Sequence, residues 1–174
     1  MIYVALLRGI NLGSKRRVAM ADLRTWVSDL GYTSVRTLLQ SGNVVFRSNK
    51  RMPTVRKELE AALAAGAGFS IDCVLRTVEE LRAVVAADPL GKVATEPSKY
   101  LVSFLDKPGD WPKVDLTEFE PERAYFEGRE AYFWVPGGMY KSKIIAAFPA
   151  RKGELATVRN WNTVTKLLAL AESV

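Results

Sequence analysis

The sequence contains no histidine and only one cysteine, and these two shortages exclude several kinds of chemistry. Without histidine there is no Ser-His or Cys-His nucleophile pair, and the commonest ligand of zinc and iron is missing. The single cysteine, Cys73, has the apolar neighbours Ile71 and Val74, which predict a buried and inert thiol. We therefore expect no metal ion and no other cofactor. Any enzyme built on this chain would use Arg, Lys, Asp, Glu, Ser, Thr, Tyr or Asn side chains.

Long hydrophobic runs are also missing. Arg8 interrupts the apolar segment that begins at Ile2, and no later segment reaches the length of a membrane span. Of the 174 residues, 48% are hydrophobic and 25% are charged, which is the composition of an ordinary globular protein. We expect a folded cytosolic protein that is neither secreted nor inserted in a membrane.

Acidic residues are fewer than basic residues. The chain has 25 Lys and Arg residues against 19 Asp and Glu residues, which gives a net charge of +6. This balance favours anionic partners such as nucleic acid, nucleotides or phosphorylated metabolites. The cations are scattered, apart from the run Lys15-Arg16-Arg17. Composition leaves the oligomeric state open.

The first half of the chain is organised around a predicted β-hairpin at residues 36–47. Two runs of β-forming residues are separated there by Ser41-Gly42-Asn43, and we expect Gly42 and Asn43 to supply the positive φ angles of a tight turn. A strand over 2–7 and a helix over 23–30 precede the hairpin. A helix over 53–63 and a strand over 70–75 follow it.

The resulting order, β-α-β-β-α-β over residues 1–76, predicts a ferredoxin-like split βαβ subdomain. A right-handed crossover makes the first two strands parallel and places the third antiparallel between them. The loop after the first strand and the turn of the hairpin then meet at one edge of the sheet. We therefore expect segments 8–11 and 40–43 to be neighbours in space.

The second half, residues 77–174, loosely repeats this order of elements. Thr77 and Glu80 form a capping box at the start of a helix, and a strand is predicted over 100–105. A Pro- and Asp-rich connection leads to a second hairpin over 123–135. The remaining predictions are a helix near 140–148 and a final helix that begins within 157–163. We expect an α+β protein of two closely packed ferredoxin-like subdomains, with mixed or antiparallel sheets, divided at 76/77.

Four stretches distributed along the chain carry a resemblance to a known family. They are Tyr3-Val4-Ala5-Leu6-Leu7-Arg8-Gly9-Ile10-Asn11, Met20-Ala21-Asp22-Leu23-Arg24, Gln40-Ser41-Gly42-Asn43-Val44-Val45-Phe46 and Thr157-Val158-Arg159-Asn160-Trp161-Asn162-Thr163-Val164. With them the sequence resembles the domain-of-unknown-function 1697 family. The resemblance implies an α+β fold of two related ferredoxin-like halves and no established activity.

Two segments of the first half are candidate parts of a binding site. The loop 8–17 joins a strand to a helix and combines glycines with four cations, a pattern that binds phosphate through backbone N–H groups and basic side chains. It does not have the spacing of a Walker A loop, and a solvated connection is the alternative. The hairpin turn can present an amide and a hydroxyl, although turn chemistry also explains its residues except Gln40. The candidates here are Arg8, Asn11, Lys15, Gln40, Ser41 and Asn43.

Two segments of the second half are further candidates. Lys143 follows two glycines at a predicted helix N-terminus, where anions are attracted, and a plain helix start is the alternative. In segment 157–163, Asn160 can cap the final helix, but capping leaves Arg159 and Asn162 without a structural role. For this segment a ligand or hydrogen-bonding role and a structural clamp on the final helix both stay open.

The working hypothesis is an anion-binding site, for a nucleotide, a phosphorylated metabolite or nucleic acid. Its candidate ligand-binding residues are Arg8, Asn11, Lys15, Gln40, Ser41, Asn43, Lys143, Arg159, Asn160 and Asn162. Two alternatives remain. One is a histidine-free enzyme acting on a phosphorylated or acidic small molecule, although no carboxylate with a specific partner can be identified. The other is a structural or protein-interaction module.

Overall fold

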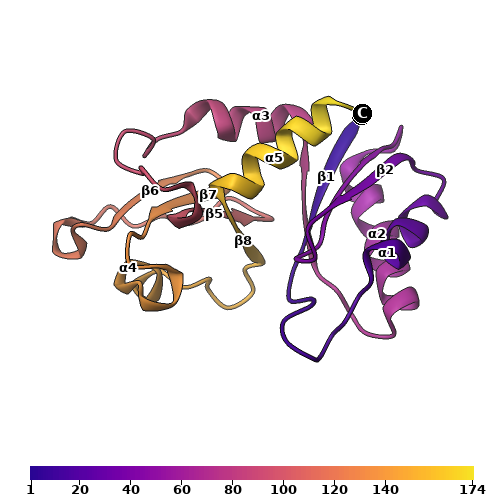
Figure 1. The fold of residues 1–174 in the computed structure, drawn as a ribbon, viewed down its shortest axis with the longest axis horizontal. Helices are drawn as coiled ribbons and strands as arrows, with labels where there is room; N and C mark the ends of the chain where they lie inside the picture. Colours follow the sequence, from indigo (N-terminus) through magenta and orange to yellow (C-terminus); the bar gives the residue numbers. More distant parts are fainter. The chain divides into compact units, whose positions relative to one another are not determined.

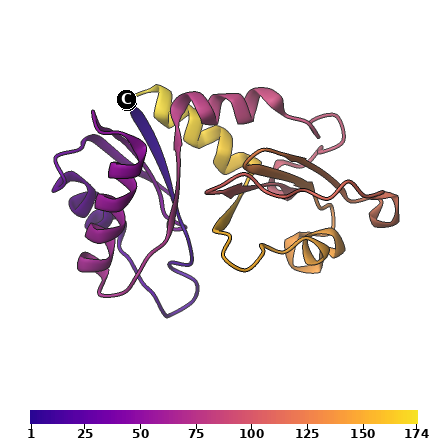
Figure 2. The ribbon, with the colours of Figure 1, turned by 180° about the vertical axis from the view of Figure 1, so that it is seen from behind.

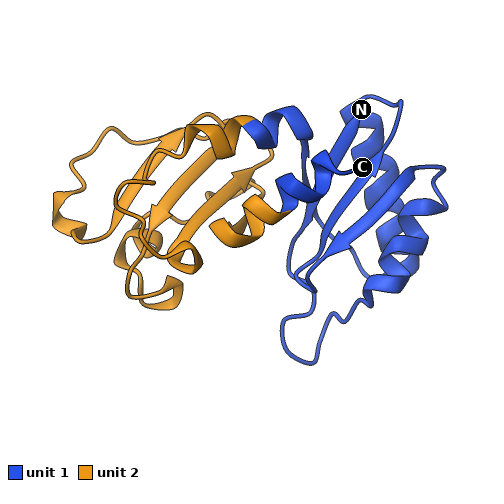
Figure 3. Ribbon diagram, turned by 45° about the horizontal axis from the view of Figure 1, so that its top comes forward, with its two compact units in different colours: residues 1–82, 167–174 blue, residues 83–166 orange.

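The computed structural model of the protein describes residues 1–174, which divide into two compact units (Figure 3). Unit 1 comprises 1–82 and 167–174, and unit 2 comprises 83–166. The C-terminal residues belong to unit 1, where Arg47 Nη2 donates to the Val174 oxygen at 2.6 Å and Arg82 pairs with Glu172 at 2.8 Å. The sequence-based division assigned all of 77–174 to the second half, because such long-range interactions cannot be read from local patterns.

Unit 1 contains one four-stranded antiparallel sheet with the strand order β2-β3-β1-β4 (Figure 1). Its elements, in chain order, are β1 (Ile2–Leu7), α1 (Met20–Ser28), β2 (Thr33–Leu38), β3 (Asn43–Arg47), α2 (Met52–Ala67), β4 (Cys73–Thr77) and the start of α3 (Val78–Ala87). The predicted capping box at the start of α3 is confirmed. Thr77 N donates to Glu80 Oε2 at 2.9 Å, and Glu80 N donates to Thr77 Oγ1 at 3.2 Å.

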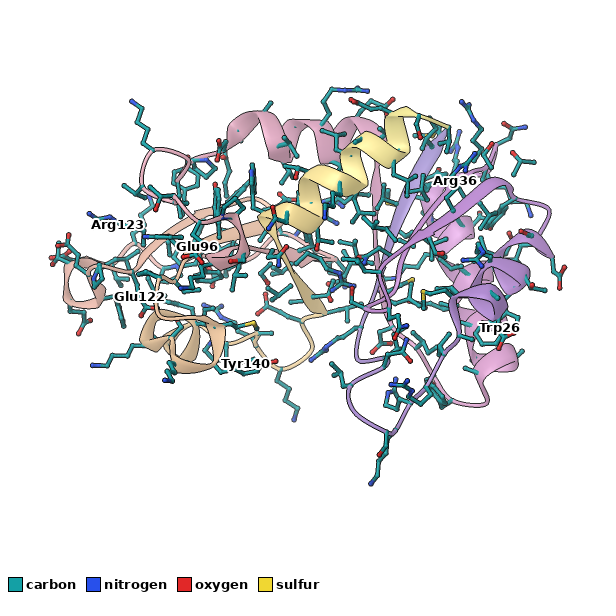
Figure 4. The ribbon with its side chains drawn as sticks, viewed as in Figure 1. Trp26, Arg36, Glu96, Glu122, Arg123 and Tyr140 are labelled. Atoms are coloured by element: carbon teal, nitrogen blue, oxygen red, sulfur yellow. The ribbon has the colours of Figure 1, made fainter.

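Two helices cover one face of this sheet, as Figures 1 and 2 show from opposite sides. The apolar positions of α1 and α2 recur at helical spacing and pack on alternate residues of β1, β3 and β4 in a single core. Trp26 of α1, labelled in Figure 4, lies against Gly66 of α2, where a Cβ atom would come within 2.3 Å of the indole ring. A glycine at this position lets the two helices approach closely.

Cys73 begins β4 and has no exposed side-chain surface. Burial raises the pKa of its thiol to about 12, so almost none of the reactive thiolate is present near pH 8. We expect the native protein to resist labelling by a thiol reagent. Once it is unfolded in denaturant, it should react with one equivalent of the reagent. Fast labelling of the native protein would contradict the buried position of Cys73.

Unit 2 contains a second four-stranded antiparallel sheet, with the order β6-β7-β5-β8. Its elements are the end of α3, β5 (Tyr100–Leu105), β6 (Arg123–Glu127), β7 (Glu130–Trp134), α4 (Lys143–Ala147), β8 (Ala156–Asn160) and the first part of α5 (Trp161–Glu172), with 3₁₀ turns η1 (Pro97–Lys99), η2 (Thr117–Phe119) and η3 (Met139–Lys141). The protein is thus an α+β protein with two antiparallel sheets and five α-helices. None of the helices is both long and apolar enough to span a lipid bilayer.

Three local predictions need correction. The final helix begins at Trp161, within the predicted stretch, but the residues before it form strand β8 along β5, which was not predicted and which the β-branched residues Thr157 and Val158 favour. The helix predicted near 140–148 is a 3₁₀ turn followed by the short helix α4. In the first hairpin turn the positive φ angles belong to Leu39 and Gly42, and Asn43 is already the first residue of β3.

The two units repeat one arrangement at the end of their last strand. Arg76 in β4 and Arg159 in β8 each lie opposite a valine of the central strand β1 or β5, and each Nη1 donates to the carbonyl of the preceding residue at 2.9 Å. The next residue caps the following helix: Thr77 caps α3, and Asn160 Oδ1 accepts from Thr163 N at 3.0 Å. This structural repeat is not visible as a repeat in the sequence.

Candidate functional site

The loop after β1 and the turn between β2 and β3 meet at one end of the sheet of unit 1. Leu6 pairs with Asn43 in the β1–β3 register, and Leu7 N donates to the Gly42 carbonyl at 2.8 Å. Beyond the strands, Asn11 Nδ2 donates to the Gln40 carbonyl at 2.7 Å. The predicted proximity of segments 8–11 and 40–43 is therefore confirmed. We call this surface, formed by residues 8–20 and 39–42, the basic rim.

Asn11 holds the loop of the basic rim in shape. Its Nδ2 also donates to the Val18 carbonyl at 2.9 Å, and its Oδ1 accepts from Val18 N at 2.8 Å. The backbone φ of Asn11 is +54°, a left-handed conformation that asparagine adopts more readily than most residues. Both amide hydrogens of Asn11 are used within the chain, so the structure gives this residue a structural role.

Ser41 and Asn43 hold the neighbouring turn. The Asn43 side chain is buried, and its Nδ2 donates to the Leu38 carbonyl at 2.7 Å and to Ser41 Oγ at 3.0 Å. Gln40 contributes its backbone carbonyl to the loop, while its exposed side-chain amide makes no hydrogen bond with the protein. Of the three candidates in the turn, Gln40 is the one that presents unused polar atoms to solvent.

The four cations of the loop have different roles. Arg16 stabilises the loop: its Nε donates to the Gly9 carbonyl at 2.7 Å, and its Nη2 donates to the Ser70 carbonyl at 2.9 Å. Its guanidinium also lies 4.5 Å from the centre of the Phe69 ring. Arg17 Nη1 donates to the Gly13 carbonyl at 2.9 Å. The exposed side chains of Arg8 and Lys15 have no partner, and none of the four cations pairs with a carboxylate.

A pocket of about 280 Å³ opens on the basic rim. It is lined by Asn11, Arg17, Val18, Ala19, Met20 and Gln40. Helix α1 begins here, and Ala19 at its N-cap has no side-chain oxygen to accept a hydrogen bond from the first turn. The pocket thus combines a guanidinium, an amide side chain and an uncapped helix N-terminus, and no carboxylate lines it. Its chemistry is that of an anion-binding surface.

The candidate residues of the second half belong to unit 2. At the N-terminus of α4, the carboxylate of Glu122, which is labelled in Figure 4, already accepts from Lys143 N at 3.0 Å and from Ile144 N at 3.2 Å. Ser142 Oγ accepts a further hydrogen bond from Ile145 N at 3.1 Å. The position where an anion was predicted therefore holds a carboxylate of this chain, and only the exposed side chain of Lys143 remains for a ligand.

Most of the candidate residues around the start of α5 have structural roles. Arg159 is buried, and its Nη1 also donates to Thr157 Oγ1 at 2.8 Å. Burial lowers the pKa of this guanidinium to about 10, because the charged form is removed from water. Asn160 caps α5, and only Asn162 presents an exposed side chain without a hydrogen-bond partner. The structure thus supplies the structural role for Arg159 that the sequence did not reveal.

Sequence reasoning missed a second hollow, in unit 2. A pocket of about 230 Å³ lies on the face of the sheet formed by alternate residues of β5, β7 and β8. Its polar lining residues are Ser103 and Glu154, and its aromatic ones are Trp111, Phe133 and Phe148. One signal pointed to it: Ser103 interrupts the apolar alternation of Leu101 and Leu105 in β5. No three acidic or cysteine side chains anywhere in the chain could hold a metal ion.

Comparison with known proteins assigns the chain to a family. No curated protein matches this sequence. Among solved structures, the conserved bacterial protein SP0830 from Streptococcus pneumoniae is similar over 98% of both chains, with 25% sequence identity and a TM-score of 0.74. The model of the family described as "Protein of unknown function (DUF1697)" matches residues 1–132. The arrangement of two antiparallel sheets is therefore shared with a bacterial relative, and this chain belongs to the DUF1697 family.

Proposed function

We propose that the protein binds a phosphate-bearing small molecule at the basic rim of unit 1. The observation that carries this proposal is the pocket of about 280 Å³ between Arg17, Gln40 and the uncapped start of α1. Phosphate oxygens accept hydrogen bonds from free backbone N–H groups at a helix N-terminus and from the fork of a guanidinium. None of the four cations of the loop has a carboxylate partner, and the exposed side chains of Arg8 and Lys15 make no hydrogen bond with the protein.

The lining of the pocket favours binding over acid–base catalysis. General acid–base chemistry needs a side chain that exchanges protons near neutral pH, and the lining offers only a guanidinium and two amides besides apolar groups. The nearby carboxylate is Asp22, in the first turn of α1, which lies outside the lining. Its negative charge opposes an incoming phosphate. Removing the charge of Asp22 therefore tests whether the site binds an anion.

Two apolar side chains on the basic rim favour a ligand that has an organic part. Leu12 is 74% exposed and Leu39 is 52% exposed, one on each of the segments that border the pocket. Exposed leucines are covered favourably by an apolar or aromatic group of a ligand. This feature favours a nucleotide over inorganic phosphate.

Calorimetric titration of the whole protein tests the proposal. The ligands are ATP, ribose 5-phosphate and a short thymidine oligonucleotide. We expect ATP to bind, Arg17→Gln to weaken binding about tenfold through the loss of a charge-assisted hydrogen bond, and Asp22→Asn to strengthen it about threefold. Arg51→Gln is the matched control, because Arg51 is an exposed arginine beyond the opposite end of β3.

The pattern across ligands and variants decides the outcome. Binding of the oligonucleotide alone, with an affinity that falls steeply as salt rises, would assign the basic rim to nucleic acid instead. If Arg17→Gln and Arg51→Gln weaken binding equally, the ligand responds only to the net charge of the protein, and the pocket is not its binding site. A lack of binding by all three ligands would refute the proposal as a whole.

We propose also that each unit is a ferredoxin-like split βαβ subdomain. The strand orders β2-β3-β1-β4 and β6-β7-β5-β8 support this assignment, as does the repeated arginine and helix cap after β4 and β8. Unit 2 departs from the pattern, since the connection between β5 and β6 contains only the short turn η2. The cytosolic location expected from the sequence stays a prediction.

A further inference from the structure

The hollow in unit 2 exists because one crossover lacks a helix. In unit 1 the connection between β1 and β2 contains α1, and α1 and α2 together cover the sheet face. The corresponding connection in unit 2, residues 106–122, contains only the turn η2, and the five-residue helix α4 follows β7 (Figure 1). Trp111, Leu116 and Phe119 of this connection pack on the sheet in place of a helix. They leave part of the sheet face uncovered.

Small side chains form the floor of this hollow. Ser103 on the central strand β5 lies between Ala131 on β7 and Val158 on β8 in the strand register, and Ala156 follows along β8. The pocket of about 230 Å³ above them shares Trp111, Phe148, Pro149, Ala150 and Glu154 with a neighbouring pocket of about 340 Å³. We call these two adjoining pockets together the hollow, and their combined volume is of the size that small organic ligands occupy.

Two polar groups of the hollow are available to a ligand. The Ser103 hydroxyl makes no hydrogen bond with the protein. Glu154 Oε1 accepts from Arg151 N at 2.7 Å, and its second oxygen has no partner. The one cation of the lining, Arg151, is held by Asp110, to whose Oδ2 its Nη1 donates at 2.8 Å and to whose carbonyl its Nη2 donates at 2.9 Å. The two carboxylates of the lining, Asp110 and Glu154, outnumber its one guanidinium, so the hollow is net negative beside its aromatic side chains.

We propose that this hollow binds a small aromatic amine. The ring lies among Trp111, Phe133 and Phe148, above the small side chains of the floor, and the ammonium group donates to the free oxygen of Glu154. Aromatic faces and a carboxylate both attract a cation, and both disfavour an anion. This ligand is opposite in charge to the one proposed for the basic rim, and the two sites are lined by residues of different units.

Nuclear magnetic resonance titration of the whole nitrogen-15-labelled protein tests this site. The probes are tryptamine and indole-3-propionate, which share a ring and differ in the sign of the side-chain charge. We expect tryptamine to bind with a dissociation constant below about 1 mM and to shift the amides of Ser103 and Ala131 and the indole N–H of Trp111. Indole-3-propionate should bind at least about tenfold more weakly.

Three variants separate the carboxylate, the cavity and the overall fold. Glu154→Gln should remove the preference for tryptamine, whereas Glu118→Gln, at an exposed carboxylate of the connection 106–122 that does not line the hollow, should preserve it. Ala131→Leu should fill the floor and abolish binding of both probes. Glu154→Gln is a near-isosteric change beside the pocket, so its result decides the proposal even if Ala131→Leu does not fold. An unchanged preference in Glu154→Gln, shifts that map outside the hollow, or no binding of tryptamine would overturn the proposal.

Discussion

Replacing Gly42 by alanine is expected to lower the free energy of unfolding by about 3 kcal/mol. Gly42 has a φ of +89°, a conformation that costs alanine roughly 1 kcal/mol. The added Cβ would also come within 2.7 Å of Ile10 Cδ1 and 2.8 Å of Leu7 Cβ. Both neighbours are buried, and Leu7 N is bonded to the Gly42 carbonyl, so neither can move aside cheaply. Urea unfolding followed by circular dichroism measures the change.

Gly31→Ala separates the backbone cost from the steric cost. Gly31 has a φ of +81° in the same unit, but nothing lies within 4 Å of the position of its Cβ. Its replacement should therefore cost only about 1 kcal/mol. If the two alanine variants lose equal stability, the close packing of the turn against β1 and its loop is wrong. That result would also remove the geometric basis of the basic rim.

Replacing Arg76 by alanine should destabilise the protein by about 3–5 kcal/mol. Arg76 is the largest of the fully buried side chains and is 1% exposed. Its removal empties a volume that the packed sheet cannot fill, and it takes away the donor at 2.9 Å from the Leu75 carbonyl. Arg76→Lys keeps the charge but loses the guanidinium fork, so its effect should be intermediate.

The control for Arg76 is Arg36→Ala, in strand β2 of the same sheet. Arg36 is exposed and has no hydrogen-bond or ion-pair partner (Figure 4). Its removal should change the free energy of unfolding by less than about 0.5 kcal/mol in the same urea experiment. A comparable loss in both arginine variants would show that Arg76 contributes only its charge, against the packing role that the structure gives it.

The arrangement of unit 1 was predictable because local patterns determine it. The apolar run of β1, the helical pattern over 23–30 and the hairpin around Gly42 leave few ways to connect the strands, and the right-handed crossover rule removes most of those. The proximity of Asn11 and Gln40 follows from that connection. The buried state of Arg76 was not predictable, because a charged residue at the end of a strand is usually exposed.

The residues around α4 and the hollow of unit 2 depend on contacts that are distant in sequence. Glu122 occupies the N-terminus of α4 although 21 positions separate it from Lys143, and no local pattern links the two residues. The connection 106–122 could be recognised as irregular, but the sequence does not tell where Trp111 packs. Strand β8 was not predicted, because residues 156–160 become a strand by pairing with β5, which lies far away in the sequence.

The most direct test of the central claim, a phosphate site at the basic rim, is a titration of nitrogen-15-labelled protein with ATP followed by two-dimensional nuclear magnetic resonance. We predict saturable shifts of the backbone amides in residues 8–22 and 39–42, together with the side-chain amide of Gln40. The same shifts should weaken in Arg17→Gln and persist in Arg51→Gln. Shifts confined to other parts of the chain, or no shifts at saturating ATP, would contradict the claim.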